Sequence, residues 1–159
     1  MELYHGSNME VESPIIKEKL RALDFGAGFY LTSSRQQAER WAKTVTKRRK
    51  TGIATLNIYH FNEEEMDSIE VLKFETANAE WLDFVVANRK EQLWGRTYDV
   101  VIGPVANDST LPVIDDYMDG VYTKEEAVKR LLPQNLTDQY AFLSNKALGL
   151  LKFIRSEVI

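Results

Sequence analysis

The chain contains no cysteine, and this absence removes several kinds of chemistry. A disulfide framework, a zinc site built from thiolates and a cysteine nucleophile all need the missing side chain. Histidine is almost as scarce, with two residues in 159, so we expect no metal site built on imidazole ligands. Catalysis would have to use oxygen and nitrogen side chains or a bound cosubstrate.

Long apolar runs are also missing. None approaches the roughly 20 residues that a membrane-spanning helix needs, and the first five residues lack the basic-then-apolar pattern of a signal peptide. We therefore expect a cytoplasmic protein with no membrane partner. The chain is 44% hydrophobic and shows no repeat, low-complexity tract or flexible linker, so we expect a single domain over residues 1–159.

The net charge of −4 gives the molecule as a whole no general attraction for nucleic acid or anionic membranes. Cations nevertheless gather in one stretch, made of Arg40, Lys43, Lys47, Arg48, Arg49 and Lys50. The ordinary explanation is a solvated helix end, whose cations suit the negative end of the helix dipole. The alternative is a docking surface for a polyanion or an acidic partner.

The hydrophobic pattern predicts short strands and helices in irregular order. Strands are expected at 3–5, 29–31, 54–59, 69–74, 98–104, 139–143 and near 153. Helices are expected from Ser33–Ser34 to just before Gly52, from Asn78 to Arg89, from Thr123 to Pro133 and briefly from Ser144. Because these segments are short and do not alternate regularly, they favour an α+β domain over a doubly wound one.

Two segments carry specific burial predictions. The first helix should bury a stripe made of Ala38, Trp41, Ala42 and Val45. Residues 54–59 alternate between apolar and polar, which is typical of a half-buried strand, and His60 on the apolar side of that strand is expected to be structural. No phosphate-binding glycine fingerprint of the Rossmann or P-loop type is present.

Three separated segments carry side chains suited to chemistry: Tyr4 to Ser7, Asp24 to Thr32 and Asp138 to Phe142. Each has an ordinary explanation by itself. An isolated histidine such as His5 is usually a surface or satisfied residue, Gly28 can serve a turn, and Tyr30 can simply pack. Their order along the chain, with a fitting element predicted at each, favours one shared site.

In this order the segments resemble the ADP-ribosyltransferase superfamily, in the branch of diphtheria toxin and the poly-ADP-ribose polymerases. That branch carries His, Tyr and Glu on three core strands, in motifs that stand here as His5-Gly6-Ser7, Gly28-Phe29-Tyr30 and Gln139-Tyr140. The chain also resembles a bacterial family of uncharacterised domains assigned to this superfamily, through Asp24 to Tyr30 and the run from Tyr98 to Asp108. The resemblance extends from Tyr4 to about Leu151.

The resemblance implies an ADP-ribosyltransferase-like fold, a split pair of antiparallel β-sheets flanked by short helices. It implies NAD as cosubstrate with no metal, and a protein or nucleic-acid acceptor. Members of the bacterial family often look like toxins of toxin–antitoxin pairs, so a small antitoxin is a candidate partner. The catalytic set would be His5, Tyr30 and Gln139, and the NAD-binding set would add Gly6, Ser7 and Gly28.

Each implied role has a physical basis. His5 would hydrogen-bond a ribose hydroxyl, and Gly6, without a side chain, would let its backbone approach the nicotinamide amide. Ser7 would supply a further hydroxyl. Tyr30 would stack on the nicotinamide ring. Because nicotinamide is a good leaving group, stabilising the oxocarbenium-like centre that it leaves behind is the main task.

The chain departs from the family pattern at Gln139, which stands where the family has glutamate. Glutamine can hydrogen-bond the ribose but carries no negative charge and cannot act as a general base. Asp138 is a poor substitute because its side chain should point to the opposite face of the strand. Asp99 and Asp108 remain alternative sources of negative charge.

Five further residues are secondary candidates. Arg21 and Arg89 could hold pyrophosphate through bidentate contacts, although arginines are common on surfaces. Gln37 could face the nicotinamide amide, although a glutamine on a helix is ordinarily exposed to solvent. For Asn107 and Asp108, a helix-capping role competes with a role in the site.

Three functions stay open at this point. The first is transfer of single ADP-ribose units from NAD to a protein or nucleic-acid target. The second is an NAD- or ADP-ribose-binding module in which Gln139 has abolished turnover. The third is a structural interaction domain whose motif match is a coincidence.

Overall fold

The computed structural model describes residues 1–16, 24–90 and 98–159. Its strands are β1 (Glu2–Ser7), β2 (Phe29–Leu31), β3 (Thr55–Phe61), β4 (Val71–Lys73), β5 (Val100–Pro104), β6 (Asp138–Phe142) and β7 (Leu151–Val158). Its helices are α1 (Arg35–Arg49), α2 (Ala79–Arg89), α3 (Leu111–Met118), α4 (Lys124–Leu131) and α5 (Asn145–Leu148), with a 3₁₀ helix η1 at Glu63–Ser68. This is the α+β composition that the sequence predicts.

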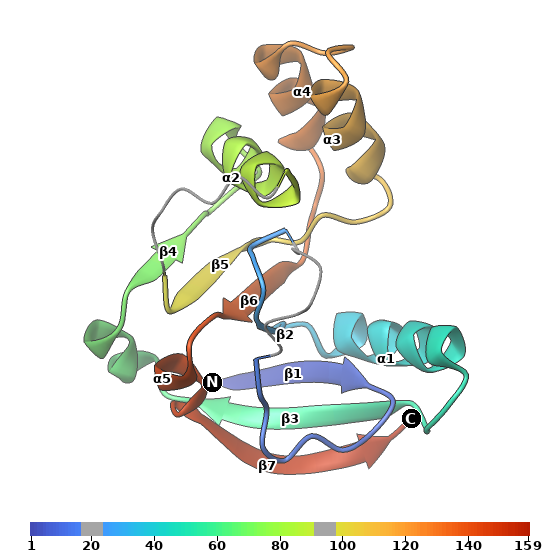
Figure 1. Ribbon diagram of the computed structural model, residues 1–159, viewed down its shortest axis with the longest axis vertical. Coiled ribbons are helices and arrows are strands. Elements are labelled where there is room, and N and C mark those ends of the chain that lie inside the picture. Colours follow the sequence, from blue (N-terminus) through green and yellow to red (C-terminus); the bar gives the residue numbers. More distant parts are fainter. Residues whose placement is uncertain (17–23, 91–97) are drawn as a thin grey trace.

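The strands form two sheets, which Figure 1 shows one above the other. The three-stranded sheet has the order β1-β3-β7 and is antiparallel throughout. The four-stranded sheet has the order β2-β6-β5-β4, and its β4 and β5 run parallel. The prediction of two antiparallel sheets is therefore wrong for the four-stranded one. The physical reason is α2, which follows β4 and precedes β5, because a helical crossover returns the chain in the same direction.

Among the described residues, one backbone bridge joins the two sheets, between Tyr4 of β1 and Thr32, the residue that follows β2. There the backbones of Tyr4 and Thr32 exchange two hydrogen bonds of 2.9 Å. Helix α1 lies against the three-stranded sheet, while α2, α3 and α4 lie beyond the four-stranded sheet (Figure 1). No helix in the described part of the chain has the length and apolar character to cross a membrane.

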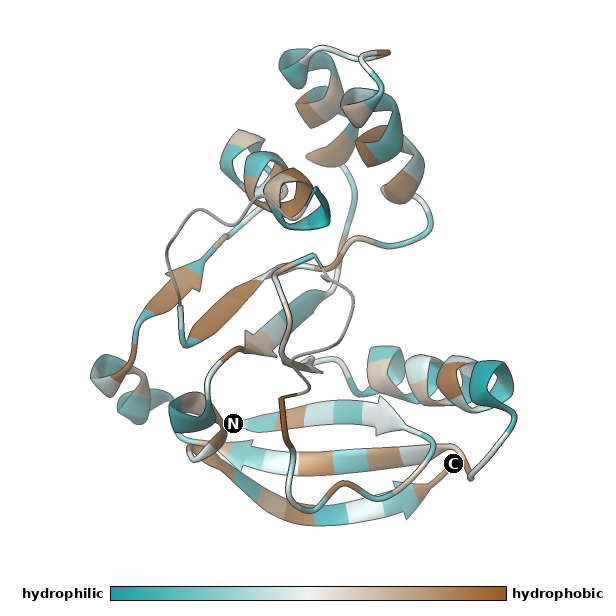
Figure 2. Cartoon of the chain, in the orientation of Figure 1, coloured by the Kyte–Doolittle hydropathy of each residue, from teal (hydrophilic) through white to brown (hydrophobic). Residues whose placement is uncertain are grey.

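The four-stranded sheet has a hydrophobic core on each face. Between the two sheets lies a core that includes Leu3, Phe29, Tyr59 and Phe142. On the opposite face, α2 and α4 close a second core around Trp81. Strand β5 is hydrophobic along most of its length (Figure 2), as a strand covered on two sides must be.

Burial differs from the sequence-based prediction in α1 and β3. Ala38, Ala42 and Val45 are buried as expected, but Trp41 is 46% exposed. Strand β3 is buried on both faces, because α1 covers one side and the core between the sheets covers the other. His60, expected on the apolar side of β3, is exposed.

The remaining differences concern element ends and one helix. The predicted strands at 69–74 and 98–104 are shorter in the structure, as β4 and β5. Helix α3, from Leu111 to Met118, was not among the predicted helices. Its second position is Pro112, and prolines are favoured at helix starts, so this signal was present in the sequence.

Candidate functional site

The fold brings the three motif segments to neighbouring strands. The His5 motif lies on β1, which bridges to β2 next to Tyr30. Strand β2 pairs with β6, where Tyr30 lies opposite Ala141. Gln139 is two residues from Ala141 on β6. Residues more than a hundred positions apart are thus neighbours in space.

His5 is held at the junction of the two sheets. Its Nδ1 lies 2.7 Å from the carbonyl oxygen of Tyr30, and its ring lies 4.2 Å from that of Phe29. Desolvation by the surrounding protein lowers the pKa of His5 from 6.5 to about 4; the hydrogen bond to the Tyr30 carbonyl opposes this shift, and the Arg49 charge adds to it. The ring is therefore neutral at pH 7. Because a carbonyl only accepts, Nδ1 carries the proton and Nε2 is left as an acceptor.

The side chain of Tyr30 is fixed by the loop that precedes it. Its hydroxyl donates to the carbonyl of Gly26 at 2.6 Å and accepts from the backbone N–H of Phe25 at 2.9 Å. Gly26 has a φ of 105°, a conformation that side chains disfavour, so a glycine here permits this turn. The loop and the ring therefore hold each other in place.

Gln139 carries a buried polar atom without a partner. The residue is 8% exposed, and its Nε2 has no hydrogen-bond acceptor among the residues that the structure describes. Leaving a buried donor unsatisfied costs about 1–3 kcal/mol, so such groups are rare in folded proteins. The alternation along β6 places Gln139 on the same face as Ala141 and thus as Tyr30. Diagonal neighbours of this kind lie about 7–8 Å apart.

The three side chains leave their strands in two directions. Tyr30 packs on the face of the four-stranded sheet that α2 and α4 cover. The ring of His5 instead contacts Phe29, which belongs to the core between the sheets. His5 thus contacts the backbone carbonyl of Tyr30, while the side chains of Tyr30 and Gln139 lie on the other face of the four-stranded sheet.

The motif glycines stand where two backbones approach closely. A Cβ on Gly6 would lie 2.1 Å from the carbonyl oxygen of Ala38 in α1, so this glycine permits the helix to pack on β1. A Cβ on Gly28 would lie 2.6 Å from the carbonyl oxygen of Phe142. The side-chain position of Gly6 therefore faces α1 and not an open cleft. Ser7 is buried, with its hydroxyl 3.5 Å from the Asn8 side chain.

Among the secondary candidates, Arg89 is engaged by the loop of the Tyr30 motif. It donates to Asp24 at 2.9 Å through Nε and lies 3.9 Å from Asp115 of α3. Burial raises the pKa of Asp24, and the neighbouring Arg89 opposes that rise. Gln37 is half-exposed on α1, and Arg21 lies outside the described residues.

The acidic and amide candidates are occupied in structural contacts or lie on the surface. Asn107 accepts from the backbone N–H groups of Ser109 and Thr110 in the turn ahead of α3, whose N-cap residue is Thr110. Asp108 is exposed. Asp99 precedes the first residue of β5, whereas Gly103, which pairs with Gln139, lies near the last. The carboxylate of Asp99 accepts from the Ser144 hydroxyl at 2.6 Å. That bond, together with one from the backbone of Glu70, lowers the pKa of Asp99.

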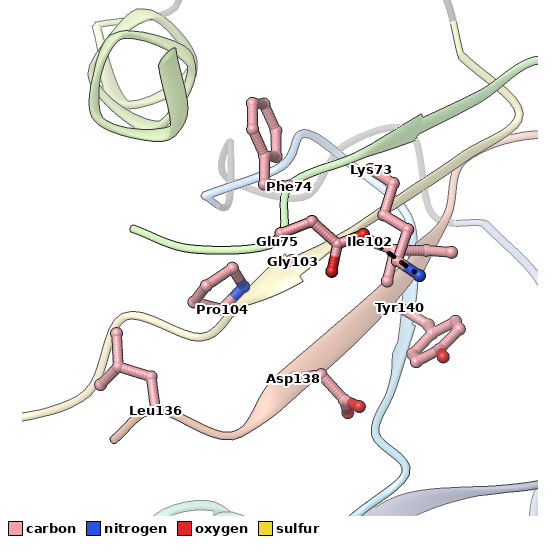
Figure 3. Close-up of a pocket in the computed structure, with 9 residues that line it drawn as sticks. All are labelled: Lys73, Phe74, Glu75, Ile102, Gly103, Pro104, Leu136, Asp138 and Tyr140. Carbon is pink, nitrogen blue, oxygen red and sulfur yellow. Dashed lines mark ion pairs between the residues drawn. The ribbon is translucent and has the colours of Figure 1, made fainter. Parts of the chain in front are cut away.

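A hollow that the sequence did not predict lies on the other face of β6. Its lining is Lys73, Phe74, Glu75, Ile102, Gly103, Pro104, Leu136, Asp138 and Tyr140 (Figure 3). Lys73 and Glu75 form an ion pair of 3.6 Å at its rim, and Asp138 is held by Thr32 and Ser33. The hollow encloses about 250 Å³, less than the roughly 300–1,000 Å³ of ordinary ligand sites.

Comparison with known proteins gives one family match. A family model described as a protein of unknown function (DUF3990) matches residues 1–153. No curated protein and no solved structure matches the chain.

Proposed function

The chain belongs to the DUF3990 family, and from its own residues we propose that it is an ADP-ribosyltransferase-like protein that binds NAD beside His5, Tyr30 and Gln139. The reaction would break the bond between the ribose C1′ and nicotinamide and form a bond from C1′ to an acceptor nucleophile. Nicotinamide leaves and the acceptor loses a proton. The observation that carries the proposal is the unpartnered amide of Gln139, buried on the same face as Tyr30.

His5 suits recognition of a ribose. Its neutral ring offers Nε2 as an acceptor for a sugar hydroxyl, since Nδ1 donates to the carbonyl of Tyr30. A positively charged ring would lose that acceptor. The low pKa therefore keeps His5 in the form that binding needs throughout the neutral range.

Tyr30 suits a planar ligand. Two hydrogen bonds to the preceding loop hold its hydroxyl, so the ring loses no side-chain freedom when a ligand stacks on it. Ring stacking contributes about 0.5–1.5 kcal/mol beyond the area that it buries. The hydroxyl thus orients the ring, and the ring would hold the nicotinamide.

Gln139 supplies hydrogen bonding without charge. Its free Nε2–H can donate to a ribose hydroxyl, which would satisfy the orphaned group. It offers no negative charge to the oxocarbenium-like centre, and losing one such stabilising group slows a reaction by about 10²–10³. This residue is also the observation that favours the second candidate, an NAD- or ADP-ribose-binding module with little turnover.

The test is to restore the charge with Gln139→Glu and to measure nicotinamide release under saturating NAD. We expect release to rise by about 10²-fold, mainly in kcat, because the charge acts on the transition state more than on bound NAD. Burial will raise the pKa of the new carboxyl, so the gain should shrink as the pH is lowered and the carboxyl becomes protonated. The matched control is Gln36→Glu on the exposed surface of α1, which should leave release unchanged.

Two further variants separate ring from hydroxyl in the Gln139→Glu background. Tyr30→Ala removes the stacking surface and should abolish the gain, whereas Tyr30→Phe keeps the ring and should retain most of it. A Gln139→Glu variant slower than an active wild type would show that glutamine is itself the working group. Saturable NAD binding without release in any variant would favour the binding module, and absence of both binding and release would refute both candidates.

A further inference from the structure

We propose that the exposed face of α1 is a binding surface for single-stranded nucleic acid. This inference goes beyond the proposed NAD chemistry and does not depend on it. The surface, named here the α1 basic face, consists of Arg40, Trp41, Lys43, Lys47, Arg48 and Lys50. All six residues are exposed.

The α1 basic face is a positively charged surface on a protein whose net charge is negative. The chain carries a net charge of −4, yet no acidic residue occurs between Glu39 and Glu63. Among the described residues, ion pairs of basic side chains involve Arg35, Lys73, Arg89, Lys124 and Arg155, and none involves the α1 basic face. Its charges are therefore unneutralised and available to an anion.

The helix dipole explains only part of this charge. Lys47, Arg48 and Arg49 lie in the last turn of α1, where cations stabilise the carbonyl end. Arg40 and Lys43 lie further back along the helix, and the dipole effect falls off within a turn. Their presence on the same side as Lys47 needs another reason.

The spacing suits a phosphate chain. Positions 40, 43 and 47 follow the three- and four-residue steps that keep side chains on one side of a helix. At 1.5 Å per residue they extend over about 10 Å, which matches about three phosphates at 3.4 Å per nucleotide of one strand. A row of cations along a helix can therefore follow a strand.

The aromatic residue on this face distinguishes a nucleic acid from an acidic peptide. Trp41 is 46% exposed, although a tryptophan on a helix facing a sheet would ordinarily be buried. The guanidinium of Arg48 lies 5.4 Å from the centre of its ring. The indole lies on the flank of the helix with Arg48, turned away from the row of Arg40, Lys43 and Lys47, and offers a surface on which a base can stack while the cations neutralise phosphates. A peptide of acidic side chains has no need of such a ring.

The helix is unsuited to lie in a membrane surface. Amphipathic membrane helices bury their apolar face in lipid. In α1 that face is Ala38, Ala42 and Val45, and it is already buried within the protein. What remains exposed is charge and one indole.

The test uses the full-length protein without NAD and a fluorescein-labelled 12-nucleotide single strand, as DNA and as RNA, followed by anisotropy. We expect saturable binding whose log K falls with log salt at a slope of about −3, from four phosphate contacts, three along the row and one at Arg48, at about −0.7 each. Lys43→Glu/Lys47→Glu should roughly halve the slope and weaken binding at least tenfold at low salt. Trp41→Ala should weaken binding about tenfold with the slope unchanged.

The matched control is Lys129→Glu/Lys152→Glu, which makes the same change of net charge at exposed positions on α4 and β7 and should bind like wild type. Equal loss in this control would assign the binding to net charge and overturn the proposal. A second result would also overturn the proposal: an oligoglutamate of equal charge competes as well as the oligonucleotide, and Trp41→Ala has no effect on binding. That result would indicate an acidic protein partner. Absence of binding at low salt overturns the proposal directly.

Discussion

His5 both stabilises the junction of the two sheets and is available to bind a ligand. Its ring bonds the carbonyl of Tyr30, packs against Phe29 and stays neutral because desolvation disfavours the charged form. Protonation would therefore act against the junction of the two sheets as well as against any ligand there. The same ring thus couples the pH of the solution to the stability of the fold.

We predict that this coupling appears as a loss of stability in mild acid. In the unfolded chain the ring has a pKa of about 6.5, and in the folded chain about 4. Between these values the unfolded state binds the extra proton, so the free energy of unfolding falls as the pH is lowered. The contribution is complete above pH 6.5 and is lost towards pH 4. It amounts to at most about 3 kcal/mol, since the ring is partly exposed.

The measurement is urea unfolding at pH 7 and pH 4.5 for wild type, His5→Asn and His60→Asn. His5→Asn should lose less stability between the two pH values than wild type. His60 is exposed, so His60→Asn should behave like wild type. An identical pH dependence in all three proteins would contradict the shifted pKa of His5.

At the scale of elements, α1 and β1 are packed so closely that only a glycine fits between them. The position that a Cβ on Gly6 would occupy is 2.1 Å from the backbone oxygen of Ala38 and 2.7 Å from the backbone nitrogen of Ala42. Backbone atoms in mid-helix cannot move aside individually. A larger residue would have to displace the whole helix from the sheet.

Gly6→Ala should therefore destabilise the fold by about 3 kcal/mol, the upper part of the range for overpacked sites. The measurement is urea unfolding, in which Gly6→Ala should show a lower midpoint than wild type. Gly149→Ala is the matched control. Gly149 has an ordinary φ of −63°, and a Cβ there would lie 3.3 Å from its nearest neighbour, the backbone oxygen of Lys146. A Gly6→Ala protein as stable as the control would show that α1 lies further from β1.

For the whole molecule, a ligand that binds only the folded state must raise its stability. At 100 times its Kd, NAD would add about 2.7 kcal/mol, and thermal melts with and without millimolar NAD should show a higher midpoint. Tyr30→Ala should abolish the shift, while Trp41→Ala, on the exposed side of α1, should keep it. An unchanged midpoint and no calorimetric heat for wild type would count against NAD binding.

The starts of α1, α2, α4 and α5 were predictable because the signals are local. Ser34, Asn78, Thr123 and Ser144 each cap the helix that follows, since their side-chain oxygens accept from a backbone N–H two or three residues on. The strand positions followed from hydrophobic runs in the same way. Such features depend on neighbours within one turn of the chain.

The contacts between distant segments decided the rest. The burial of β3 on both faces, the exposure of Trp41 and the parallel pairing of β4 depend on which element covers which. The sequence by itself determined an α+β chain, its capped helices and three motif segments whose order resembles an ADP-ribosyltransferase. Only the tertiary structure placed Gly6 under α1 and left the Gln139 amide without a partner, because close packing and unsatisfied burial arise between residues that the chain order keeps apart.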